Sequence, residues 1–163
     1  MILALSGCSS WICNDTTAER GEAGVRVQVV GMDGRPLGVT AAVVDWRLEP
    51  HPQEPSKGDQ VRFRFRFRFD NANGYSDAAV DACAVDKKRV VLGCKTVYSS
   101  QAFGPADDPL TGDDWLGVQH PEQVAGVLLI PNDQSYYGRT CEADMKDGGG
   151  THPPEQPRRG EEL

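Results

Sequence analysis

The chain of 163 residues lacks the motifs that mark most metal proteins and cofactor-binding proteins. It contains no C-x-x-C pair, and its three histidines, His51, His120 and His152, all neighbour prolines and lie away from any cysteine. Zinc sites use closely spaced cysteines and histidines, so no metal site is predicted. A glycine-rich phosphate loop is also missing, because the glycine run at residues 148–150 precedes no helical pattern. We therefore predict no metal and no cofactor.

Basic residues are in the minority. Lysines and arginines number 17 against 24 acidic residues, which gives a formal net charge of −7. The phosphate backbone of a nucleic acid repels such a chain, so no nucleic-acid partner is expected. An anionic membrane surface repels it as well, so attachment to a membrane requires an anchor other than charge.

Catalytic motifs are equally scarce. The segment G-Y-S-D-A, which begins at Gly74, lacks the second glycine of a nucleophile elbow. Pairs of acidic residues occur, but any acidic surface provides them. We predict no catalytic residue and a protein that is not an enzyme. An enzyme whose site is carried by loops is kept as an alternative, because a fold does not determine a function.

The first eight residues contain a membrane-anchoring motif. Leu5-Ser6-Gly7-Cys8 resembles the lipobox of bacterial lipoproteins. The resemblance implies that a signal peptidase cuts before Cys8, whose thiol then carries a lipid (diacylglycerol, with palmitate). Residues 1–7 would be the remainder of a signal peptide, and the protein would be exported and anchored to the bacterial cell membrane. No basic n-region is present and the apolar segment is short, so we expect the natural start to lie upstream.

The cysteine count agrees with export. Lipidation of Cys8 leaves four cysteines, an even number that can form two disulfides in an oxidising compartment. Three pairings are possible, and the sequence does not choose among them. We favour Cys83 with Cys94, which flank one predicted hairpin, and Cys13 with Cys141, which would tie the two ends together.

The chain divides into a polar tether at residues 8–24, a body at residues 25–145 and a polar tail at residues 146–163. The tail has nothing apolar enough to pack and is predicted to be disordered. The body contains short runs rich in β-branched and aromatic residues, separated by glycine and proline turns. Seven strands are predicted, near residues 25–30, 37–49, 61–69, 80–86, 89–98, 123–131 and 135–143.

Seven strands without a convincing helix predict an all-β fold, an immunoglobulin-like β-sandwich, with an open β-barrel as the alternative. The chain is similar to the immunoglobulin-like lipoprotein domains of actinobacteria in its tether, in a strand ending at Asn73-Gly74 and in a late V-L-L-I-P at residues 127–131. The disulfide and tryptophan spacing of antibody domains is absent. That resemblance implies an extracellular, lipid-anchored domain.

The most regular segment alternates arginine and phenylalanine from residue 62 to residue 69. Successive side chains of a strand point to opposite faces, so the four phenylalanines share one face. Burying them contributes roughly 6 to 12 kcal/mol, which predicts that this strand is the centre of the core. The opposite, outer face would then carry Arg62, Arg64, Arg66 and Arg68.

Two interpretations of these arginines are open. In the first, which the surplus of acids favours, they pair with acids on neighbouring strands, for which the candidates are Asp45, Glu49 and Asp81. In the second, they form a cationic ladder for an anionic partner such as a cell-wall polymer, a lipid headgroup or an acidic protein. Guanidinium groups suit phosphate and carboxylate, so the second interpretation is chemically sound.

A second candidate site is the acidic segment that contains Asp107, Asp108, Asp113 and Asp114. Carboxylates bind calcium, but the spacing of the common calcium loop is absent, so a solvated acidic loop is predicted. Trp115 beside it is predicted to plug one end of the core, with an exposed contact residue as the alternative.

These observations predict a lipid-anchored, non-catalytic binding protein of the bacterial cell surface. Its partner would be an anionic envelope component or another surface protein. The alternative from a different class is a phage- or prophage-encoded envelope lipoprotein that blocks superinfection or another envelope process, which the small size and the anchor motivate.

Overall fold

The computed structural model describes residues 21–30, 36–69, 78–99, 110–131 and 156–163, which contain seven strands and two single-turn 3-10 helices. None of the helices in these ranges is long and apolar enough to cross a membrane. The strands are β1 (Arg26–Val30), β2 (Pro36–Pro50), β3 (Asp59–Phe69), β4 (Ala78–Val85), β5 (Val91–Ser99), β6 (Leu110–Leu116) and β7 (Gly126–Pro131), and the 3-10 helices are η1 (Pro55–Lys57) and η2 (Pro121–Gln123).

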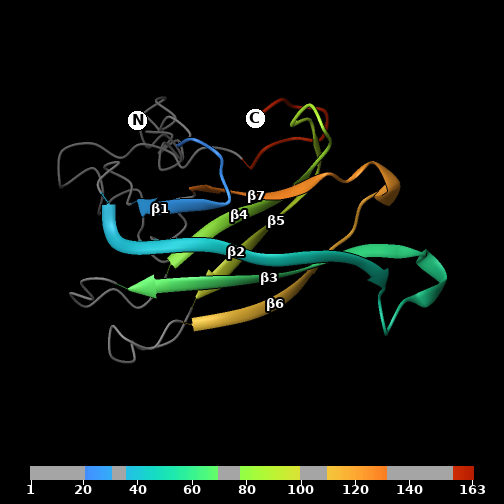
Figure 1. Ribbon diagram of the computed structural model, residues 1–163, viewed down its shortest axis with the longest axis horizontal. Coiled ribbons are helices and arrows are strands. Elements are labelled where there is room, and N and C mark those ends of the chain that lie inside the picture. The colour runs from blue at the N-terminus through green and yellow to red at the C-terminus, as the bar shows by residue number, and fades with distance from the viewer. Residues whose placement is uncertain (1–20, 31–35, 70–77, 100–109, 132–155) are drawn as a thin grey trace, which may run out of the picture.

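The strands form two antiparallel sheets that pack face to face, which confirms the predicted all-β sandwich (Figure 1). One sheet has the order β1-β2-β3-β6, and the other has the order β5-β4-β7. The division into four and three strands is that of an immunoglobulin constant-type domain, but the order differs, because here β2 pairs with the next strand in sequence, β3. The sheets are joined at one edge by a bridge between Gly24 and Leu129.

The phenylalanine face of β3 forms the centre of the core, as predicted. Phe63 and Phe67 are fully buried, and Phe65 between them is 8% exposed. The Phe65 ring lies 6.0 Å from the Phe63 ring and 5.7 Å from the Phe67 ring, measured between centroids. The opposite sheet contributes small side chains of β4 to the same cluster, so the large rings of one sheet are accommodated by alanines of the other.

Strand β2 contains a β-bulge that the sequence pattern did not reveal. Strict alternation along residues 37–49 would place Val44, Trp46 and Leu48 on one face. In the structure Val43 pairs with Phe65, Asp45 pairs with Arg64, and Val44 is the extra residue between them. Trp46 and Leu48 therefore pack against the core, whereas Val44 is 41% exposed.

Strand β6 is the second correction. The segment around Asp113 and Asp114 was predicted to be a loop, but residues 110–116 pair with β3 along their whole length. This strand was not recognised from the sequence because a glycine and two aspartates occupy its centre, whereas strands are normally recognised by apolar alternation. The strand predicted at residues 135–143 lies outside the described residues.

The two ends of the folded body also differ from the prediction. Residues 21–24, predicted to belong to the tether, contact the sandwich, since Gly24 exchanges two backbone hydrogen bonds with Leu129. Residues 156–163, predicted to be disordered, lie against β5, because the amide of Val91 donates to Glu161 and the amide of Gly160 donates back to Val91. Backbone hydrogen bonds, which composition does not report, hold this C-terminal segment.

We predict that Gly112 in β6 is required for the packing of Phe65. A Cβ at residue 112 would lie 2.5 Å from Cζ of Phe65, closer than any real contact. Gly112→Ala should therefore lower the free energy of unfolding by about 1–3 kcal/mol through overpacking, measured by chemical denaturation. Gly117→Ala is the matched control, because a Cβ there meets nothing within 4 Å. Equal stability of the two variants would contradict the prediction.

Candidate functional site

The outer side of the four-stranded sheet is the candidate site, and we call it the arginine face. Its members follow from the strand register, because paired residues in antiparallel strands point to the same side. Six of its side chains are cationic and three are anionic, although the whole chain has a net charge of −7. The charged members are Arg26, Asp45, Arg47, Glu49, Arg62, Arg64, Arg66, Arg68 and Asp113.

One end of the arginine face is neutralised by local ion pairs. Arg62 lies 3.0 Å from Glu49 and 3.8 Å from Asp113. Arg64 lies 3.5 Å from Asp45 and 3.7 Å from the same Asp113 carboxylate. The predicted local pairing is thus confirmed for these two arginines, with Asp45 and Glu49 as partners. Asp113 is a further partner that was not predicted, because its segment was predicted to be a loop. Partly exposed pairs of this kind contribute about 0–1 kcal/mol each.

Trp115 lies on this same end and does not plug the core. Its register partner is Arg62, whose guanidinium carbon is 5.7 Å from the centroid of the indole ring. The ring of His51 packs against the indole in a T-shaped arrangement, with 4.6 Å between centroids. The core position at the end of β6 belongs to the next residue, Leu116, which is buried opposite Val61. Cation–π and aromatic contacts fix Trp115 on the outer face.

The carboxylate of Glu49 is the group most affected by this arrangement. A hydrogen bond from Arg47 and a second from Arg62 lower the pKa of Glu49 below its ordinary value, and they outweigh the opposing effect of desolvation. The same contact raises the pKa of Arg47. Both residues therefore stay ionised across the physiological range, and neither is suited to exchange protons near neutral pH.

The other end of the arginine face has a different composition. Arg66 lies between Ala42 on β2 and Thr111 on β6, and Arg26 lies on the far side of the same Ala42. Within the described ranges, neither Arg26 nor Arg66 forms an ion pair. The arginines of β3 are thus not equivalent, because local acids neutralise Arg62 and Arg64 but not Arg66.

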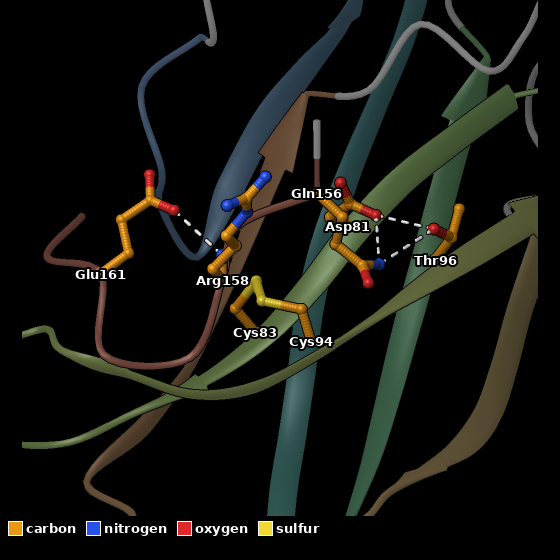
Figure 2. The surroundings of a disulfide bond; sticks show 7 residues. All are labelled: Asp81, Cys83, Cys94, Thr96, Gln156, Arg158 and Glu161. Carbon is orange, nitrogen blue, oxygen red and sulfur yellow. Dashed lines mark hydrogen bonds between the residues drawn. A yellow bond between two sulfur atoms is a disulfide. The ribbon is translucent and has the colours of Figure 1, made fainter. Parts of the chain in front are cut away.

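Asp81, the third predicted partner of the arginines, lies in the other sheet. It is 2% exposed and accepts hydrogen bonds from the hydroxyl of Thr96, at 2.8 Å, and from Nε2 of Gln156, at 2.9 Å. Figure 2 shows these three side chains beside the disulfide between Cys83 and Cys94. The predicted Cys83–Cys94 pair is therefore confirmed. The hydrogen bond from Gln156 to the buried Asp81 holds the C-terminal segment against the sheet.

The remaining described acids and histidines form no second site. In the part of the chain that the structure describes, no group of three histidine, cysteine or acidic side chains is arranged to hold a metal ion. A groove of about 470 Å³ lies beside the bulge and is lined by the exposed Val25 and Val44. The carboxylate of Asp86, also in its wall, already accepts from the amides of Lys88 and Val90. The other charged residues that line the groove are Asp45, Lys87 and Arg89.

Several predicted site residues lie outside the described residues. They are the proposed lipidation site, the second proposed disulfide and half of the acidic segment, namely Cys8, Cys13, Asp107, Asp108 and Cys141.

No family model matches the chain, and no similar protein was found among the curated proteins or the solved structures. Function therefore has to be inferred from the chain's own residues.

We predict that Arg47 and Arg62 set the pKa of Glu49. Arg47→Gln and Arg62→Gln should each raise the pKa of this carboxyl toward its ordinary value, because each removes a hydrogen-bond donor and a positive charge. A lowered carboxyl pKa stabilises the folded state above the pKa of the unfolded chain, and this contribution is lost as the pH falls through the folded-state value. Carboxyl-carbon NMR titration measures the change. Arg66→Gln is the control, and an equal shift in that variant would contradict the assignment.

Proposed function

We propose that the protein is a lipid-anchored, non-catalytic binding protein of the bacterial cell surface, which contacts an anionic component of the envelope through its arginine face. The observation that carries the proposal is the concentration of cations on that face. Six arginines and three carboxylates stand on one side of a chain whose total charge is strongly negative. A surface of this sign attracts anionic partners and orients the protein toward them.

The outer faces of the two sheets also differ in how far they are exposed to a binding partner. On the three-stranded sheet, the C-terminal segment hydrogen-bonds to β5 and Gln156 contacts Asp81 and Thr96. On the four-stranded sheet, Arg66 and Arg68 of β3 are exposed. The arginine face is exposed and charged, whereas the C-terminal segment partly covers the opposite face. This difference favours the arginine face as the contact surface.

The proposed location rests on one feature of the sequence and one of the structure. Leu5-Ser6-Gly7-Cys8 resembles a lipobox, and a lipid anchor overcomes the repulsion between an acidic chain and an anionic membrane. The disulfide between Cys83 and Cys94 supports export, because such bonds persist in oxidising compartments and are rare in the cytosol.

The anchor predicts lipidation at Cys8. Cells fed a labelled fatty acid should incorporate the label into this protein, and Cys8→Ala should abolish incorporation while the chain is still produced. Cys13→Ala is the matched control, because it removes a nearby cysteine that the motif does not include. A wild-type protein that is exported without the label would refute the anchor.

The contact surface predicts salt-sensitive binding to isolated cell envelopes. The full chain carrying Cys8→Ala, which removes the lipid contribution, should sediment with envelopes at low salt and be released as salt is added. Arg64→Gln with Arg66→Gln should weaken this binding, whereas Lys87→Gln with Lys88→Gln removes two exposed charges elsewhere and should not. Failure of the wild-type face to bind envelopes at any salt concentration would overturn the proposed function.

A further inference from the structure

One end of the arginine face, around Ala42, carries no carboxylate among the described residues. Arg26 of β1 and Arg66 of β3 are both register partners of Ala42 on β2, so the three residues form one row across the sheet. Adjacent strands are about 4.8 Å apart, which separates the two arginine backbones by about 10 Å. The methyl group of Ala42 is the only side chain between them. Two long arginine side chains on either side of so small a residue leave room for a ligand above it.

The same sheet contains an internal comparison. One row further along, beyond the bulge, Arg64 has Asp45 on one side and Asp113 on the other. In the Ala42 row these two positions are taken by Ala42 itself and by Thr111, which carry no charge. Arg26 and Arg66 are thus two like charges on the same face, and no carboxylate of the described residues lies between them. An anion above Ala42 would remove that repulsion, as the two aspartates do for Arg64.

We propose that Arg26 and Arg66 form a two-arginine clamp for a phosphate group, and that the envelope ligand is a polymer or lipid that carries phosphodiesters. The inference rests on the proposed binding function and names the chemistry of its ligand. Guanidinium groups bind both carboxylates and phosphates through paired hydrogen bonds. A phosphodiester presents two non-bridging oxygens that diverge, so guanidiniums approaching from opposite sides can each bind one. The hydroxyl of Thr40, the next outward-facing residue on β2, supplies a further donor.

Calorimetric titration with soluble linear polyphosphate tests the clamp on the full chain carrying Cys8→Ala. Arg26→Gln and Arg66→Gln should each weaken binding about ten-fold or more, the usual effect of losing a charge-assisted hydrogen bond. Arg64→Gln is the matched control, because it removes the same side chain from the same strand at a position that carboxylates already neutralise. Added salt should weaken binding in the wild type. Equal losses for Arg64→Gln and Arg66→Gln would overturn the clamp.

A second variant tests the same row by placing a permanent anion at residue 42. Ala42→Glu introduces a carboxylate between the two arginines, so it should abolish polyphosphate binding and leave the thermal melt unchanged or raised. Gln119→Glu adds the same charge in an exposed segment and should retain binding. Polyphosphate binding that persists in a folded Ala42→Glu variant would contradict the inference. If that variant does not fold, the Arg26→Gln and Arg66→Gln variants still decide whether the clamp exists.

Three probes separate the sources of the ligand. Binding to polyphosphate and to phosphatidylcholine vesicles containing phosphatidylglycerol supports recognition of the phosphate itself, and binding to the vesicles alone assigns the phosphate to a lipid headgroup. Equal binding to polyglutamate would overturn the preference for phosphate. If the wild type binds envelopes but none of the phosphate probes, the clamp is refuted and the proposed function survives. If envelopes are not bound at all, the proposed function itself fails.

Discussion

The two-residue alternation of β3 is the constraint on which the rest of the molecule depends. Its phenylalanines must enter the core and its arginines must then stand outside, because consecutive side chains cannot share a face. The neighbouring elements adapt to both consequences. Gly112 leaves space for the Phe65 ring, and Asp113 beside it turns outward to meet Arg62 and Arg64. One short strand therefore determines the packing of the interior and the charge of the exterior together.

The sequence was sufficient wherever a side-chain pattern was local and regular. The buried face of β3 and the pairing of Cys83 with Cys94 followed from alternation and from two cysteines at the flanks of one hairpin. The arginine face was predicted as a unit, but its division into a neutralised end and a carboxylate-free end was not. That division depends on which residues of β2 and β6 lie opposite each arginine, and register is a property of paired strands.

Three features could not be predicted from the sequence, each for a different physical reason. Strand β6 lies at the edge of its sheet, where charged residues are commonly used to prevent pairing with another chain. The C-terminal segment is held mainly by backbone hydrogen bonds, which every sequence can form, together with the contact from Gln156 to Asp81. Trp115 was expected inside because tryptophan is large and apolar. A guanidinium over its ring and a histidine against its edge provide an alternative environment on the surface.

The bulge at Val44 sets the shape of the sheet without affecting which residues pair. With Val44 absent, Val43 would still lie opposite Phe65 and the following aspartate would still lie opposite Arg64, so a chain shorter by this residue keeps every cross-strand partner. What the extra residue adds is local twist. It lies between the row of Ala42 and the row of Asp45, so it rotates the carboxylate-free part of the surface relative to the neutralised part. The change in twist and the change in charge along this face therefore occur at the same residue. Insertion or deletion at Val44 can alter the angle between the Ala42 row and the Asp45 row while the core is preserved.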